Sequence, residues 1–188
     1  GDRGFDIVFG KSSRVDAVMN VSSIDGSNGF HLLSGNGLHL LGINDVTNAG
    51  DVNGDGFDDL IASGTETSDS ISDFSYVVFG KNSGFKAILK LSNIDGSNGF
   101  RLDGATKNDY SGTSVSSAGD LNGDGFSDLI IGAREARNAL GASYVVFGKA
   151  SGFSAAINLS SMNGNNGFRL EANSVNGYDA IGSVSNAG

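Results

Sequence analysis

The chain has 188 residues, enough for one ordinary domain, and it contains 30 glycines, no proline and no cysteine. The absence of cysteine excludes a disulfide scaffold and a thiolate metal site, and a net charge of −9 argues against nucleic-acid partners. No stretch approaches the roughly 18 apolar residues of a membrane-spanning helix, so we expect no membrane insertion.

Three short motifs recur along the chain and divide it into repeats of about 69 residues. Each repeat carries Phe-Gly-Lys, then a turn of the type Ile-Asp-Gly-Ser-Asn-Gly-Phe, then Ala-Gly. Residues 1–188 therefore hold a little under three repeats, and the third stops at Gly188, before the segment that follows Ala-Gly in the other two. The motifs lie at 9–11, 79–81 and 147–149, at 24–30, 94–100 and 162–168, and at 49–50, 118–119 and 187–188.

Four short strands are predicted within one repeat from its apolar runs and flanking turn residues. The segment Ala155–Ser160, between the last two strands, is either an extra strand or an extended loop. Repeated four-stranded units of this length are typical of β-propeller blades, so we predict an all-β, partial and open propeller of antiparallel sheets. The strands are Thr113–Ala118, Asp128–Gly132, Ala142–Gly148 and Gly167–Leu170.

Recurrent phenylalanines accompany these strands. We expect them to form the core, because aromatic side chains dominate core burial. They are Phe57, Phe79, Phe85, Phe126, Phe147 and Phe153.

An acidic nine-residue loop occurs twice, at 51–59 and again 69 residues later at 120–128. Its first, third, fifth and ninth positions carry side-chain oxygens, and glycines at the fourth and sixth let the backbone curl so that these oxygens converge. Three carboxylates in nine residues repel one another unless a cation neutralises them. The pattern therefore favours Ca²⁺, which takes six to eight oxygen ligands, over an ordinary turn rich in Asp and Asn.

An EF-hand is excluded by the residue at position twelve, where that motif needs a bidentate Glu. Here the position holds Ala62 or Ile131, within an apolar run that favours a strand over a helix. The closing carboxylate must then come from the ninth position, Asp59 or Asp128. Asp58 has no acidic counterpart in the second loop, so we interpret it as a solvated surface charge.

The segment Ala118–Ala133 resembles the FG-GAP repeat of integrin alpha-subunit propellers and of bacterial surface and secreted proteins. In that family about seven repeats usually close into a propeller, so the resemblance implies that residues 1–188 are a fragment of one. It also implies two Ca²⁺ sites between strands on one face. The implied ligands are Asp51, Asn53, Asp55, Asp59 and the carbonyl of Phe57, and likewise Asp120, Asn122, Asp124, Asp128 and the carbonyl of Phe126.

Catalysis is not expected from this chain. Its two histidines are His31, in the place of Arg101 and Arg169 of the other repeats, and His39. No Gly-x-Ser-x-Gly elbow, Walker loop or dinucleotide fingerprint is present. We expect a calcium-binding module of a large secreted or cell-surface protein, with an unknown protein or glycan ligand and neighbouring repeats of the same chain as partners. The alternative is the non-catalytic propeller part of a secreted phospholipase or polysaccharide-active hydrolase.

Overall fold

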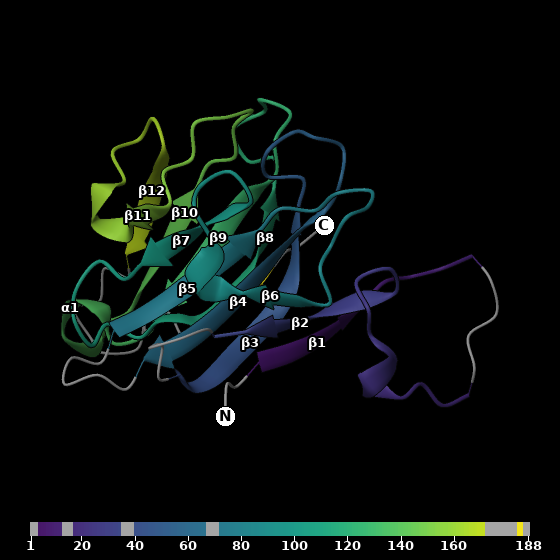
Figure 1. Ribbon diagram of the computed structural model, residues 1–188. Coiled ribbons are helices and arrows are strands. Elements are labelled where there is room, and N and C mark those ends of the chain that lie inside the picture. The colour runs from purple at the N-terminus through teal and green to yellow at the C-terminus, as the bar shows by residue number, and fades with distance from the viewer. Residues whose placement is uncertain (1–3, 13–16, 35–39, 67–71, 172–183, 186–188) are drawn as a thin grey trace. The chain divides into compact units, whose positions relative to one another are not determined.

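The computed structural model describes residues 4–12, 17–34, 40–66, 72–171 and 184–185 (Figure 1). Within these ranges the chain forms twelve strands in three separate sheets, with no closed barrel, so the predicted all-β class is confirmed. No helix in the described residues is long and apolar enough to cross a membrane. His39 and the last predicted Ala-Gly, at 187–188, lie outside the described ranges.

The third sheet contains the four predicted strands, antiparallel and in the order β12-β10-β9-β8. Every predicted boundary is correct to within two residues. A single helical turn, α1 (Ala136–Ala139), joins the second strand to the third. The strands are β8 (Ser111–Gly119), β9 (Asp128–Ala133), β10 (Ala142–Val146) and β12 (Gly167–Glu171).

The second sheet repeats this arrangement one repeat earlier and adds a fifth strand. The fifth strand is β11 (Ala156–Asn158), which pairs in parallel with β7. The segment Ala155–Ser160 is therefore a strand that continues into a short 3₁₀ turn (Leu159–Ser161), and it pairs with the preceding repeat instead of its own. The other four strands are β3 (Leu40–Gly50), β4 (Asp59–Glu66), β5 (Ser72–Val78) and β7 (Gly99–Asp103).

The first sheet belongs to a compact part of the chain built from described residues of 1–38 and 81–93, whereas the other two sheets belong to a second compact part. It holds the last two strands of the first repeat and again a parallel strand from the next one. Turns Val21–Ser23 and Leu91–Asn93 are 3₁₀. Its strands are β1 (Gly4–Val8), β2 (Gly29–Leu33) and β6 (Ile88–Lys90), in the order β1-β2-β6.

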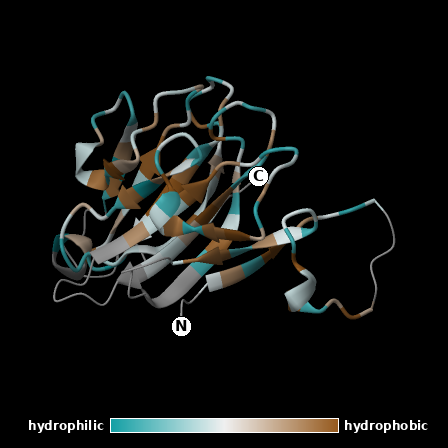
Figure 2. Cartoon of the chain, in the orientation of Figure 1, coloured by the Kyte–Doolittle hydropathy of each residue, from teal (hydrophilic) through white to brown (hydrophobic). Residues whose placement is uncertain are grey.

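One hydrophobic core joins the second and third sheets. It contains Ile61 and Val77 of the second sheet together with Leu129 and Ile131 of the third, each no more than 1 % exposed. Figure 2 shows hydrophobic residues on the strands and hydrophilic residues on the connecting loops. All five residues of β10 are buried: this strand lies between β12 and β9, and Ala142, Tyr144 and Val146 belong to the core.

Phe85 and Phe153, which precede the parallel strands β6 and β11, each belong to a triad of phenylalanine rings. Phe153 stacks on Phe100 with ring centroids 4.5 Å apart, and Phe79 packs against both rings. In the first sheet Phe9, Phe30 and Phe85 form the same triad. The core prediction is wrong for Phe57, whose side chain is 39 % exposed because it lies on the loop between β3 and β4.

We expect Phe100→Ala to be more destabilising than the same change at Phe168, its counterpart in the third sheet. Phe100 is fully buried and contacts two rings, so its truncation should lower the free energy of unfolding by about 3–5 kcal/mol. Phe168 contacts only Phe147 among the described aromatic rings, so its loss should be about 1–2 kcal/mol. Urea unfolding followed by circular dichroism measures both, and equal losses would contradict the role of the third ring.

Candidate metal centre

Each acidic loop joins the first strand of a sheet to the second: residues 51–59 connect β3 to β4, and residues 120–128 connect β8 to β9. The glycines at the fourth and sixth positions adopt the left-handed conformation, with φ of +74° at Gly54 and +88° at Gly56. Gly123 and Gly125 have φ of +77° and +91°. Side chains with a Cβ rarely adopt these angles, so the glycines allow the tight curl.

The first aspartate of each loop organises the curl by accepting backbone hydrogen bonds. Asp51 Oδ1 accepts from the N–H of Gly54 at 2.7 Å and of Asp55 at 3.1 Å, and Oδ2 accepts from Gly56 at 2.9 Å. Asp120 repeats the pattern with Gly123, Asp124 and Gly125 at 2.8, 3.0 and 2.9 Å.

The residues at the third and fifth positions of each loop are hydrogen-bonded to each other. Asn53 Oδ1 accepts from the Asp55 N–H at 2.9 Å, and its amide donates to Asp55 Oδ2 at 3.0 Å. Asp55 Oδ1 then accepts from the Phe57 N–H at 3.0 Å. The same three bonds recur in the second loop among Asn122, Asp124 and Phe126, at 2.9, 2.8 and 3.0 Å.

The ninth aspartate is buried and ties the loop to the rest of its repeat. Asp59, 3 % exposed, accepts from the N–H of Val52 at 2.9 Å and of Gly80 at 2.8 Å. Asp128 is fully buried and accepts from Leu121 at 2.8 Å and Gly148 at 3.0 Å.

Gly80 and Gly148 are the glycines of Phe-Gly-Lys. The sequence signal for their role is that this motif follows the ninth aspartate by nearly the same distance in both repeats, 21 residues to Gly80 and 20 to Gly148. A Cβ at Gly80 would lie 2.2 Å from the Asp58 carbonyl oxygen, and one at Gly148 would lie 2.5 Å from that of Ser127. In both repeats the backbone of the acidic loop therefore packs directly against the glycine of Phe-Gly-Lys.

The electrostatics of the ninth position reflect burial among like charges. Burial, the largest cause, and the charges of Asp55 and Asp51 together raise the pKa of Asp59 to about 6, although the N–H bonds from Gly80 and Val52 lower it. The pKa of Asp128 is likewise raised, first by burial and then by Asp124 and Asp120. The three carboxylates of each loop are thus close enough to interact.

The donor set fits a hard cation in its chemistry. All side-chain donors are oxygens, and an ionised carboxylate has about four lone-pair positions, of which Asp55 and Asp59 each use two. In the described part of the chain, however, no three acidic or histidine side chains gather around one point as a ready-made cage. Cation binding at the ten predicted residues stays a prediction.

The second loop packs onto the first. Asp51 and Val52 accept, through their carbonyl oxygens, from the N–H of Ser127 at 2.9 Å and of Lys149 at 3.0 Å. The Phe126 ring covers Gly54, where a Cβ would lie 2.3 Å from the ring edge. Sequence reasoning missed this contact, because the motif within one repeat carries no information about its neighbour.

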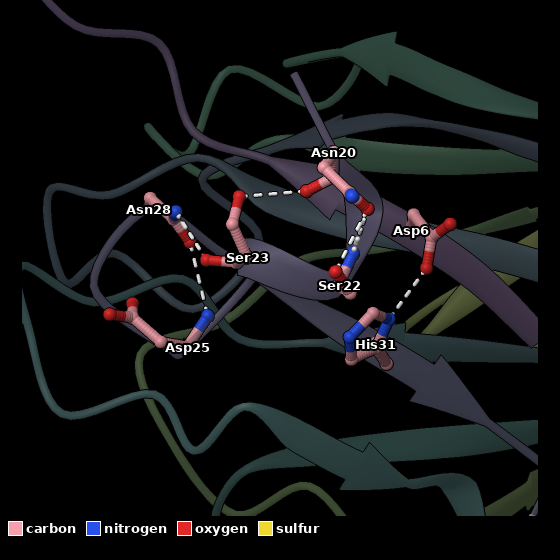
Figure 3. A network of polar contacts seen from close by, with 7 residues as sticks. All are labelled: Asp6, Asn20, Ser22, Ser23, Asp25, Asn28 and His31. Atoms are coloured by element: carbon pink, nitrogen blue, oxygen red, sulfur yellow. Dashed lines mark hydrogen bonds and ion pairs between the residues drawn. The ribbon is translucent and has the colours of Figure 1, made fainter.

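The structure also shows the surroundings of two other residues that the sequence singled out. Asp58 is exposed, and it accepts a hydrogen bond from the Asn48 side chain at 2.9 Å. His31 lies opposite Asp6 on β1 and β2, and its Nδ1 is 2.6 Å from Asp6 Oδ1 (Figure 3). Figure 3 also shows Asn20 accepting from Ser22, which caps the 3₁₀ turn Val21–Ser23.

Repeated four-stranded sheets, each with a curled acidic loop between its first two strands, define a propeller-type repeat protein. Residues 111–146 match the FG-GAP repeat family. The match spans β8, the loop at 120–128, β9 and β10. Residues 111–146 therefore form an FG-GAP repeat. Such repeats are structural, non-catalytic modules and occur in extracellular and surface proteins.

Gly54→Ala and Gly123→Ala are a matched pair that tests the packing between loops. Both residues have positive φ, so each change should cost about 1–2 kcal/mol of stability. At Gly54 the new methyl also meets the Phe126 ring, which adds about 1–3 kcal/mol, whereas at Gly123 no atom of the described residues lies within 4 Å of it. Thermal melting of the two variants should give a lower Tm for Gly54→Ala; equal melting temperatures would contradict the contact.

Proposed function

We propose that this chain is a calcium-binding propeller module of a secreted or cell-surface protein, where it serves adhesion or another protein or glycan interaction. One observation carries the calcium proposal: two loops 69 residues apart have the same hydrogen-bond network, and each places an Asp that is at most 3 % exposed next to two further carboxylates. A divalent cation would neutralise this charge.

The proposed ligands are the oxygens of the first, third, fifth and ninth side chains and the carbonyl of the seventh residue. In the first loop these belong to Asp51, Asn53, Asp55, Asp59 and Phe57. The bonds from Gly54, Asp55 and Gly56 to Asp51 already fix the curl, so little ordering of the loop remains for binding. The second loop offers the same set at 120–128.

Calcium suits the extracellular setting that is common for this family. Sites in extracellular modules bind with dissociation constants of about 10⁻⁴–10⁻³ M, and outside cells the ion is abundant enough to fill them. Mg²⁺ demands near-ideal octahedral geometry and keeps its waters, so we expect these flexible loops to bind it much more weakly. The bound ion would be structural, stiffening the end of each blade from which the loops project.

Isothermal titration should show two Ca²⁺ sites in the unaltered chain. Asp55→Ala should remove one, Asp124→Ala the other, and the double variant both, because each change deletes a central carboxylate. Asp58→Ala is the matched control, since this neighbouring acid is exposed and bonded to Asn48. Undiminished Ca²⁺ binding by the double variant would refute the assignment.

Chelation should lower the stability of the chain. A ligand that binds only the folded state stabilises it by RT ln(1 + [L]/Kd), about 1.4 kcal/mol per site at tenfold excess over Kd. We therefore expect the Tm to fall on addition of EDTA and to recover with excess Ca²⁺. The Asp55→Ala, Asp124→Ala double variant should show neither response, which separates loss of the ion from a direct effect of EDTA.

A further inference from the structure

The two acidic loops contact each other through residues next to their proposed ligands. The carbonyl oxygen of Asp51, whose carboxylate is a proposed ligand, accepts from the N–H of Ser127 at 2.9 Å. Ser127 lies between Phe126 and Asp128, two proposed ligands of the second loop. The residue before Asp51 is held as closely, since a Cβ at Gly50 would lie 2.3 Å from Ser127 Oγ. The start of the first loop is thus fixed to the end of the second.

A chain of three hydrogen bonds joins the buried ninth aspartates of the two loops. Asp128 Oδ1 accepts from the Gly148 N–H at 3.0 Å. The next N–H, that of Lys149, donates to the Val52 carbonyl at 3.0 Å, and the Val52 N–H donates to Asp59 Oδ2 at 2.9 Å. Gly148 permits this approach, because a Cβ there would lie 2.8 Å from the Val52 oxygen. The position of one carboxylate is therefore tied to that of the other through a contiguous hydrogen-bond network.

The Phe126 ring adds a side-chain contact at the centre of the first loop. It lies against Gly54, where a Cβ would be 2.3 Å from the ring edge. Gly54 lies between Asn53 and Asp55, the third and fifth ligand positions. The carbonyl of Phe126 is itself a proposed ligand of the second loop. One residue thus belongs to the second site and packs on the first.

The curl of each loop is fixed by its first aspartate, but the other ligands still have to be ordered. Among the described residues no three acidic side chains already surround one point, so the third, fifth and ninth side chains must turn toward an ion. Filling the second loop restrains Phe126 and Asp128, and through their contacts it restrains the first loop. A loop that is already restrained loses less conformational entropy on binding, so the second binding event becomes more favourable.

Charge opposes this effect only in part. The proposed ligands of each loop include three carboxylates, so a loop that holds a doubly charged ion keeps a net negative charge. Such a loop attracts a second ion less than an empty loop does, but it does not repel the ion. Salt screens this difference, since the Debye length falls from about 10 Å at 0.1 M to about 3 Å at 1 M.

We propose that the two acidic loops form a coupled pair of cation sites, in which an ion bound to either loop raises the affinity of the other. The contacts that couple them are the Phe126 ring and the backbone of Gly148 and Lys149. This inference rests on the proposed function and adds the order in which the sites fill. Coupling is reciprocal, so each loop changes the affinity of the other by the same factor.

Calcium titration in about 0.3 M KCl compares the unaltered chain with Asp55→Ala and Asp124→Ala, each of which keeps one site. Independent loops would give an isotherm equal to the sum of the two single-site isotherms. A coupling factor of about ten, within the usual range, would instead lower the half-saturating Ca²⁺ concentration about threefold and give a Hill coefficient of about 1.5.

Lys149→Pro and Lys81→Pro are a matched pair that tests the hydrogen-bond chain. Both remove a side chain that donates to a glycine carbonyl and lies over a phenylalanine ring, and neither alters a proposed ligand. Only Lys149 donates its N–H to the other loop among the described residues, and proline lacks that N–H. Lys149→Pro should reduce the coupling factor at least threefold, whereas Lys81→Pro should keep it. Phe126→Ala, which keeps its carbonyl, should also reduce the factor and serves if Lys149→Pro does not fold.

Hydrogen exchange gives a second readout in the Asp55→Ala variant, where Ca²⁺ fills only the second loop. Exchange of the Gly54 and Gly56 N–H groups, which donate to Asp51, should nevertheless slow when Ca²⁺ is added. The Asp55→Ala, Asp124→Ala double variant should show no such change. Two filled sites with additive isotherms, or unchanged exchange in Asp55→Ala, would overturn the coupling and leave the calcium function standing. A folded chain that binds no Ca²⁺ would overturn both.

Discussion

A single buried carboxylate in each repeat connects three segments that are distant in sequence. Asp59 begins the second strand, receives the N–H of Val52 from the start of the loop, and receives the N–H of Gly80 from the turn after the third strand. Asp128 does the same in the next repeat. The closure of the loop onto β4 and the position of Phe-Gly-Lys both depend on this residue. Since a buried carboxylate needs hydrogen-bond donors, removing either N–H would leave one of its oxygens without a partner.

The contacts between repeats depend in turn on the loops. Because the curl is fixed, the carbonyl oxygens of Asp51 and Val52 face the next repeat and accept from Ser127 and Lys149. The Lys149 side chain then donates to the Gly152 carbonyl and lies over the Phe153 ring, 4.9 Å from its centroid. One chain of contacts thus leads from the acidic loop of one repeat to the aromatic ring that docks on its outer strand.

The sequence predicted the structural features that lie within a single repeat. The four strands of the third sheet and both acidic loops follow from apolar runs, turn residues and duplication, and the family match at 111–146 agrees. It did not predict the contacts between repeats, in which β11 pairs with β7 and Phe126 covers Gly54. Such contacts depend on how two copies pack, which periodicity within one copy does not specify. The prediction that Phe57 lies in the core was wrong for a related reason. This residue recurs because it occupies the same position in each acidic loop, and recurrence alone does not show that a side chain is buried.

The parallel docking of β11 and β6 has a consequence for the order of folding during synthesis. The sheet that ends at β7 is complete only after β11 has been made, and Asn158 follows Asp103 by 55 residues. At about 5–20 residues per second, the outer edge of each sheet waits roughly 3–11 s for its last strand. A nascent chain therefore always exposes the edge of its most recent sheet, and each new repeat closes the one made before it.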